Sequence, residues 1–245
     1  MDNKSTSNST TTYGPTFISP STGFCVDDER EDTLLCTPAW AAWAGSCPKW
    51  KGMSDDVRWA FVNKHNEYRS LVAKGNAPNP RYGGFAPKAA RMFKVSYDCD
   101  IEKNMMAWIE KCQWGHSPRS ARQGLGENLW MISLPDYDKW ESAVNATGSW
   151  FDELRQFGVP VDNVFSVDVS RKGVGHYTQL VSQRSDRIGC AVKSCPGMTY
   201  AGCQYKEPGN FINSYIYETD TCIAKPIFQV NAIQDDSNGN STLSR

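Results

Sequence analysis

Apolar positions recur at helical spacing in three segments of the chain. The first begins at Ser54, a hydroxyl residue suited to cap a helix, and two aspartates follow it where the positive end of the helix dipole would lie. Apolar and aromatic residues then return every three or four positions until Gly75. A second such segment starts at Asp98. The pattern predicts helices over about 55–74, from Asp98 to about Cys112, and over roughly 137–157.

The pattern changes to alternation between Arg187 and Tyr205, which indicates two β-strands around Pro196-Gly197. In a symmetric hairpin centred on this pair, residues whose numbers sum to 393 face each other, so Cys190 opposes Cys203. Opposed residues of antiparallel strands lie about 4.5–5.5 Å apart at Cα, within reach of a disulfide. L-Pro-Gly does not favour the tightest turns, so a wider loop stays open, and any symmetric loop keeps the pairing.

Composition divides the chain into a core and two polar ends. Of the 245 residues, 40% are apolar, which is enough for one large domain or two small ones. Residues 1–22 are dominated by Ser, Thr and Asn and indicate a flexible arm. Residues 23–51 carry three cysteines and indicate an extension stapled to the body. The tail at 223–245 is polar and is expected to fray.

The charge balance argues against several classes of partner. The formal net charge is −1, and the Lys and Arg residues are scattered along the sequence, so nucleic acid is not expected to bind. No segment has the apolar length of a membrane span. Residues 1–22 also lack the profile of a signal peptide, which predicts a removed leader or a processed or engineered form.

Nine cysteines predict an oxidising, extracellular environment. They form no C-x-x-C pair, so disulfides are favoured over a zinc site, and the odd count implies a free or intermolecular thiol. Sequons for N-glycosylation agree with passage through the secretory pathway. They begin at Asn3, Asn8, Asn145 and Asn240.

One histidine has a distinctive setting. His176 follows Gly175 and precedes a short apolar run, in the sequence Gly-His-Tyr-Thr-Gln-Leu-Val. An imidazole there can be a metal ligand, a general base or a hydrogen-bonded structural group, and this stretch alone does not decide between them. Glu153 lies at the edge of the apolar stripe of the third helix, where desolvation tends to raise the pKa of an acid.

Four motifs in order carry a family resemblance. They are His65-Asn66-x-x-Arg69, Gly126-Glu127-Asn128, Gly-His-Tyr-Thr-Gln-Leu-Val at 175–181, and Cys-Gln-Tyr-Lys-Glu-Pro-Gly-Asn-Phe at 203–211. With them the sequence resembles the CAP superfamily (SCP/TAPS proteins), and its cysteine pattern is most similar to the venom allergen-like and activation-associated secreted proteins of parasitic worms. The resemblance covers about 52–222, which is assigned as the CAP domain.

The resemblance implies an α+β fold, an α-β-α sandwich with a small antiparallel sheet, stabilised by disulfides. It also implies a cavity lined by His116, His176, Glu127 and Glu153. In several members the histidines bind zinc or another divalent cation, with the glutamates in a water-mediated role. Such an ion is expected to be a cofactor that the fold does not need.

The chemistry of these four residues leaves three uses open. Two imidazole ligands plus water would leave a divalent ion open to further ligands. A nearby carboxylate could then activate a bound water, as in metal-dependent hydrolysis. Otherwise the four side chains form a polar network that organises the core.

Further roles follow from the resemblance and from burial. His65, Asn66 and Arg69 are expected to form a structural network that anchors loops. By resemblance, Cys47 pairs with Cys112 and Cys195 with Cys222, beside Cys190 with Cys203. One further bridge and a spare thiol are left to Cys25, Cys36 and Cys99.

The function expected from this resemblance is that of a secreted, extracellular, non-catalytic protein that binds lipid or a host protein as an immunomodulatory effector. A fatty acid would lie between the helices at 55–74 and 137–157. A sterol would bind the loop before Gly175, although Phe157, Phe165 and Val167 lack the aromatic spacing of sterol-binding members. The alternatives are a metal-dependent hydrolase using the four polar residues, and a structural or adhesive module.

Overall fold

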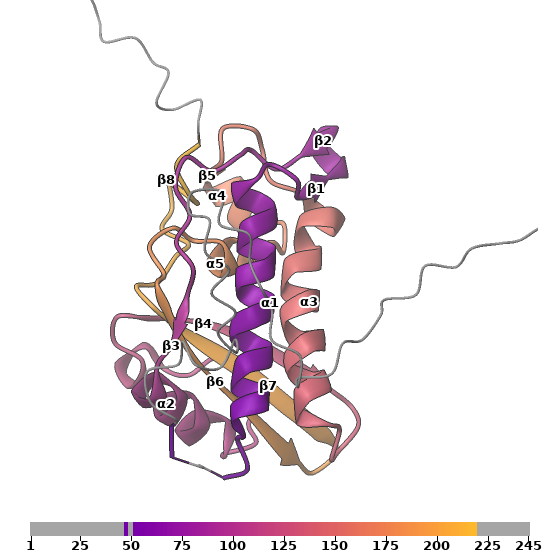
Figure 1. The fold of residues 1–245 in the computed structure, drawn as a ribbon, viewed down its shortest axis with the longest axis vertical. Helices are drawn as coiled ribbons and strands as arrows, with labels where there is room; N and C mark the ends of the chain where they lie inside the picture. Colours follow the sequence, from indigo (N-terminus) through magenta and orange to yellow (C-terminus); the bar gives the residue numbers. More distant parts are fainter. Residues whose placement is uncertain (1–46, 49–50, 220–245) are drawn as a thin grey trace, which may run out of the picture. The chain divides into compact units, whose positions relative to one another are not determined.

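The computed structural model describes residues 47–48 and 51–219, which are built on a four-stranded sheet with the order β3-β6-β7-β4 (Figure 1). Strand β3 pairs with β6 in parallel, and β6/β7 and β7/β4 are antiparallel. Two-stranded ribbons are formed by β1 with β2 and by β5 with β8. The strands are β1 (Pro78–Asn79), β2 (Gly84–Phe85), β3 (Ser96–Tyr97), β4 (Leu125–Ile132), β5 (Val164–Phe165), β6 (Arg187–Cys195), β7 (Met198–Lys206) and β8 (Ser214–Tyr215).

Helices cover both faces of the sheet. A Cβ on Gly189 would lie 2.1 Å from the backbone nitrogen of Glu102, so α2 packs directly on one face of β6. On the other face lie α1 and α3, side by side (Figure 1). The helices are α1 (Asp55–Ala73), α2 (Cys99–Ile109), α3 (Lys139–Phe157), α4 (Val167–Ser170) and α5 (Gly175–Leu180), with 3-10 turns at Pro80–Tyr82 and Arg119–Ala121. The expected α-β-α sandwich is confirmed.

Side-chain caps fix where the three long helices begin. The Ser54 hydroxyl accepts a hydrogen bond from the backbone N–H of Val57, as the sequence predicted. Asp98 caps α2 in the same way. The third helix begins at Lys139 instead of 137, because Asp138 accepts from the N–H of Glu141. Cys112 lies beyond the end of α2 and has a positive φ of 53°.

The hairpin has the predicted register, with Arg187 opposite Lys206 and Cys190 opposite Cys203. Pairing continues to Cys195 and Met198, so the loop is the two-residue turn Pro196-Gly197, and the wider loop is wrong. Gly197 has a φ of +78°, and a type II turn needs such a residue directly after proline. Proline and glycine therefore each occupy the turn position that suits them.

Three disulfides lie within the described residues, and one of them was predicted. Cys190–Cys203 is confirmed. The pairings Cys47–Cys112 and Cys195–Cys222 are wrong, because Cys47 bonds to Cys99 at the start of α2 and Cys112 bonds to Cys195. Cys99 is therefore not a spare thiol. Its bond places Cys47 at the start of α2, and the Cys112–Cys195 bond joins the end of α2 to the end of β6. Cys25, Cys36 and Cys222 lie outside the described residues.

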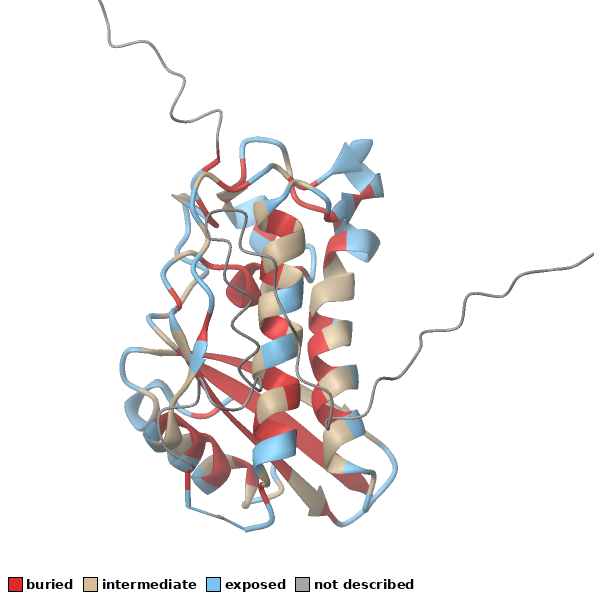
Figure 2. Cartoon of the chain, in the orientation of Figure 1, coloured by how far each residue is buried: buried red, intermediate tan, exposed pale blue. Residues whose placement is uncertain are grey.

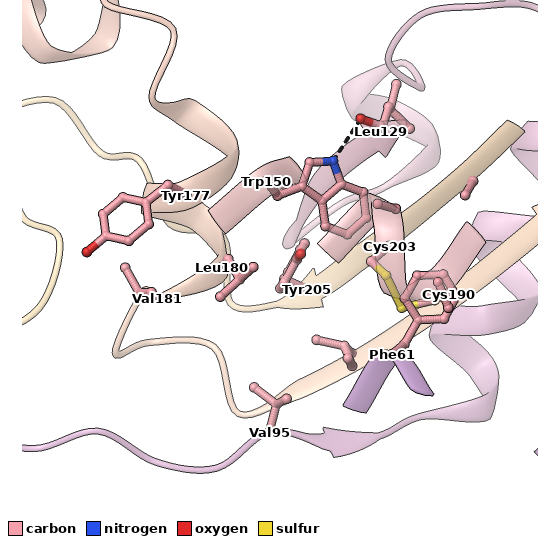
Figure 3. Close-up of a cluster of buried hydrophobic side chains, with 14 of the residues drawn as sticks. Phe61, Val95, Leu129, Trp150, Tyr177, Leu180, Val181, Cys190, Cys203 and Tyr205 are labelled. Carbon is pink, nitrogen blue, oxygen red and sulfur yellow. Dashed lines mark hydrogen bonds between the residues drawn. A yellow bond between two sulfur atoms is a disulfide. The ribbon is translucent and has the colours of Figure 1, made fainter. Parts of the chain in front are cut away.

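The core occupies both faces of the sheet (Figures 2 and 3). Residues of α1 and α3 pack on one face, and Met105, Met106 and Ile109 of α2 pack on the other. Trp150 of α3 is 2% exposed and donates its indole N–H to the Leu129 carbonyl at 2.9 Å, which ties α3 to the outer strand β4. Eight of the nine residues of β7 are buried because helices or loops cover both of its faces. Apolar alternation in the sequence did not indicate β4, whose buried positions include Glu127 and Asn128.

Candidate functional site

Strand β4 positions the first of two imidazole–carboxylate pairs. The Glu127 side chain is fully buried, and its Oε1 lies 2.8 Å from His116 Nδ1. The same oxygen accepts from the backbone N–H of Ser117 at 2.9 Å. Its Oε2 accepts from the Ser117 hydroxyl at 2.6 Å and from the side-chain amide of Gln204 at 2.9 Å. Glu127 therefore accepts four hydrogen bonds.

These bonds decide the charge of Glu127. Burial alone would raise its pKa, but hydrogen bonds from His116, Ser117 and Gln204 to the ionised form outweigh it and lower the pKa below its ordinary value. An ionised carboxylate only accepts hydrogen bonds, so His116 Nδ1 carries the proton.

Helix α3 and the start of α5 form the second pair. His176 Nδ1 lies 2.5 Å from Glu153 Oε1. The other oxygen of Glu153 accepts from the backbone N–H groups of His176 and Tyr177, at 2.9 and 3.0 Å. This carboxylate holds both the ring and the backbone that carries it. The His176 ring is also stacked near Trp150, with the ring centroids 6.3 Å apart.

Both pairs leave Nε2 available. Each Nδ1 faces a carboxylate, so the lone pair of each ring resides on Nε2, and no partner among the described residues contacts that atom. The side chains of His116 and His176 are 54% and 37% exposed. A histidine that donates one N–H to a carboxylate and presents the other nitrogen outward has the arrangement of a metal ligand. The donor chemistry of both residues therefore fits a divalent ion.

Within residues 47–48 and 51–219, no group of three or more His, Cys, Asp or Glu side chains is arranged to hold a metal ion. The glutamates contact the histidines directly, and the water-mediated role expected for them stays a prediction. Any ion bound here would rest on imidazole nitrogen and water.

A buried chain of hydrogen bonds connects α1 to His176. Tyr205 OH lies 2.8 Å from His65 Nε2 and accepts from Asn128 Nδ2 at 3.0 Å. Asn128 also donates to the His176 carbonyl at 2.9 Å. Because His65 Nδ1 faces the Phe61 carbonyl at 2.7 Å, Nδ1 carries the proton and Nε2 accepts from the tyrosine. The backbone at His176 is thus fixed from the core side as well.

Burial of His65 makes the fold sensitive to acid. Desolvation lowers the pKa of His65 to about 4, against a partial opposing effect of the bond to Phe61. The unfolded chain therefore takes up this proton near its ordinary pKa while the folded chain does not, so stability is full above pH 6.5 and is lost as pH falls towards 4. We expect a loss of about 2.5 kcal/mol between neutral pH and about pH 4.5.

Chemical denaturation at a series of pH values measures this loss. His65→Gln removes the titrating group and should flatten the profile over that range, while lowering stability at neutral pH. An equally steep profile in the variant would assign the acid sensitivity to other groups.

Asn66 and Arg69 contact two loops. Asn66 exchanges two hydrogen bonds with the backbone of Val95, at 3.0 and 2.8 Å. Arg69 is 1% exposed and donates to four backbone carbonyls, those of Phe93, Leu180, Ser182 and Ser185. Burial lowers the pKa of Arg69 to about 10. Three of these carbonyls lie at the end of α5 or just after it, so Arg69 fixes the segment that follows His176.

Three functional neighbours were given no role from the sequence. Ser117, Gln204 and Asn128 complete the two pairs, and two of them, Asn128 and Gln204, belong to the family motifs at 126–128 and 203–211. The motifs do not tell what these side chains contact. Position gives a further signal, because Ser117 follows His116, Asn128 follows Glu127, and Gln204 lies opposite Glu127 in the β4/β7 register.

The comparisons with known proteins identify the class. The model of the CAP family, the cysteine-rich secretory protein family, matches residues 62–205. The chain belongs to this family, and the predicted resemblance to its worm members is confirmed.

The relatives include worm and vertebrate proteins. Ancylostoma secreted protein of Ancylostoma caninum is 42% identical over 174 residues, covering 70% of this chain and 41% of that protein. Human cysteine-rich secretory protein 2 is 34% identical over 166 residues, covering 64% of this chain and 58% of that protein. The chain thus spans about two fifths to three fifths of these two curated relatives.

Solved structures share the fold. The crystal structure of NaASP2 with Zn2+ has a TM-score of 0.69 at 42% identity, covering 71% of this chain and 90% of that one. Na-ASP-1 has a TM-score of 0.69 at 39% identity, covering 72% of this chain and 45% of that one.

Proposed function

We propose that this protein is a secreted, non-catalytic binding protein that acts on a host partner as an immunomodulatory effector, and that His116 and His176 can hold a divalent ion such as Zn2+. The observation that carries the proposal is the hydrogen bonding of the two carboxylates. Glu127 accepts four hydrogen bonds and Glu153 three, all from groups that orient the histidines. Both acids therefore serve to orient an imidazole that can bind an ion.

The same bonds argue against the metal-dependent hydrolase. A general base must be able to take a proton from water, and neither carboxylate has an oxygen without a donor. Two nearby hydroxyl groups are also engaged. Ser117 is 3% exposed and donates to Glu127, and Thr178 is fully buried and donates to Asn210 Oδ1 at 2.6 Å. A bound ion would supply Lewis acidity, but these carboxylates and hydroxyl groups offer it no free base.

Secretion is supported by the disulfides, by the names of the relatives and by one described sequon. Asn145 lies on the exposed side of α3, where it donates to Tyr137 OH at 2.9 Å, so the folded surface has room for a glycan. Asn3, Asn8 and Asn240 lie outside the described residues. Among the helices that the structure describes, none has the length and apolar character needed to cross a membrane.

The structure restricts where a lipid could bind. Between α1 and α3, Tyr68 stacks on Phe151 with ring centroids 4.1 Å apart, and Phe151 also contacts Tyr177 at 5.6 Å. A fatty acid between these helices would have to displace that stack. Apolar side chains are instead exposed around the β5/β8 ribbon. They are Val161, Val167, Phe211, Ile212 and Tyr215. We place the proposed lipid, a sterol or a fatty acid, on this surface.

One experiment tests the proposed function as a whole. Native mass spectrometry of the full chain after incubation with zinc, cholesterol and palmitate should show one ion and bound lipid. The same sample should not hydrolyse peptide or ester substrates faster than a variant carrying His116→Ala and His176→Ala. Val167→Asp should reduce lipid binding, whereas Val62→Asp on α1 should not. Hydrolysis that depends on Glu153 would refute the non-catalytic proposal, and a protein that takes up neither lipid would refute the lipid part.

A further inference from the structure

One stretch of the chain departs from the scattered charge distribution. Residues 68–97 contain six Lys or Arg residues and no Asp or Glu, in a chain whose formal net charge is −1. The six are Arg69, Lys74, Arg81, Lys88, Arg91 and Lys94. Arg69 is buried and serves the structural role described above, whereas the other five are exposed. Of these five, Arg81 donates to the backbone carbonyl of Gln156 at 2.7 Å.

The fold brings four of these cations onto one strip. After the β1/β2 ribbon the chain turns back and runs beside the C-terminal half of α1 towards β3 (Figure 1). A Cβ on Gly75 would lie 3.2 Å from the Cβ of Lys88, and the Ala89 N–H contacts the Val72 carbonyl at 3.5 Å. Further along, Phe93 O accepts from Arg69. The basic strip, defined as Lys74, Lys88, Arg91 and Lys94, therefore follows the helix.

The backbone of the strip is held from inside. Arg69 binds the carbonyl of Phe93, and Asn66 binds both backbone groups of Val95. A partner therefore meets cations on a fixed backbone, which lowers the ordering cost of binding. The Arg91 guanidinium lies 5.4 Å from the ring of Phe93, which is itself 52% exposed.

In the part of the chain that the structure describes, two acidic residues lie near the strip. Glu218 is exposed and its backbone carbonyl accepts from Ala90 N–H at 2.8 Å, which brings it beside the strip. Glu67 of α1 is paired with Lys64 at 2.8 Å. Over residues 47–48 and 51–219, the strip keeps a positive balance after both are counted.

We propose that the basic strip binds a sulfated polysaccharide chain. From Lys88 to Lys94 the segment can span at most about 20 Å, which is the length over which a linear polyanion can contact it. Phe93 is the one exposed large apolar side chain that the structure describes between Lys88 and Val95, so this segment has little surface to insert into a bilayer. The choice of a glycan over anionic phospholipid also rests on the proposed secretion, since anionic lipids lie mainly in the cytoplasmic leaflet.

Heparin binding by the full chain tests this proposal. The triple variant Lys88→Gln, Arg91→Gln, Lys94→Gln should bind heparin about tenfold or more weakly, and the slope of log affinity against log salt should fall by about 2–3. A matched control loses the same charge from the α2 side of the domain, through Lys103→Gln, Lys111→Gln and Arg119→Gln. It should keep most of the affinity. Glu218→Gln should bind more tightly than the wild type.

Three results would overturn the proposal. They are equal losses in the two triple variants, no binding of the wild type to heparin, and tighter binding to vesicles of phosphatidylcholine and phosphatidylserine than to heparin. Zinc binding is measured on the same proteins, so that the heparin test is distinguished from the test of the ion site. The triple variant of the strip should still bind zinc. A wild-type protein that binds heparin but not zinc would count against the proposed ion site alone.

Discussion

Replacing Arg58 by methionine is expected to lower the free energy of unfolding by about 3–5 kcal/mol. Arg58 is fully buried and forms two hydrogen bonds with Glu102, both at 2.7 Å. Removing the guanidinium leaves Glu102, which is 1% exposed, as a buried charge without its cation, although the Tyr97 hydroxyl still donates to it. Arg58 also donates to the carbonyls of Cys47 and Pro48, so the substitution frees the segment that carries the Cys47–Cys99 disulfide.

Denaturant unfolding measures this effect, and two further variants isolate its cause. Lys64→Met removes a cation from the exposed Lys64–Glu67 pair on the same helix and should cost less than about 1 kcal/mol. Combining Arg58→Met with Glu102→Leu should recover part of the loss, because no charge is then left buried. Equal effects of Arg58→Met and Lys64→Met on the free energy of unfolding would show that the buried pair contributes no more to stability than the exposed one.

Glu153→Gln is expected to weaken zinc binding by about 10–100-fold without unfolding the protein. The oxygen of the introduced amide can still accept from the backbone N–H groups of His176 and Tyr177. Its NH2 group then faces His176 Nδ1 and favours the tautomer with the proton on Nε2. That proton occupies the lone pair with which His176 would bind the ion.

Calorimetric titration with zinc measures the loss. Asp152→Asn is the matched control, since Asp152 is the neighbouring acid on α3 and pairs with Arg155 on the surface. It should leave the zinc affinity unchanged. An unchanged affinity in Glu153→Gln would contradict the role given to Glu153 as the residue that sets the tautomer of His176.

The parts of the fold that the sequence predicted are those encoded by local chemistry. Helix starts at Ser54 and Asp98 follow from capping residues, and the Cys190–Cys203 pairing follows from hairpin symmetry. The disulfides of Cys47 and Cys112 could not be predicted in this way. Their partners depend on how α2 packs against β6 and where the N-terminal segment meets α2, which are long-range arrangements.

The geometry of the candidate site could not be predicted from the sequence. Family motifs point to His116, Glu127, Glu153 and His176, yet they do not tell which acid contacts which ring. The pairing depends on β4 being the outer strand and on α5 beginning against α3. Strand β4 itself was missed because its polar residues Glu127 and Asn128 are buried among apolar ones, which obscures the alternation that indicates a strand.

The central claim is that two carboxylate-oriented histidines present Nε2 to an ion. Because the chain has three histidines, ¹⁵N NMR of the imidazole rings during a zinc titration tests it directly. The expected result is a change of the Nε2 signals of His116 and His176 at one equivalent of zinc, with His65 unaffected in the core. Zinc that binds without changing either signal would contradict the assignment of these two residues as the ligands.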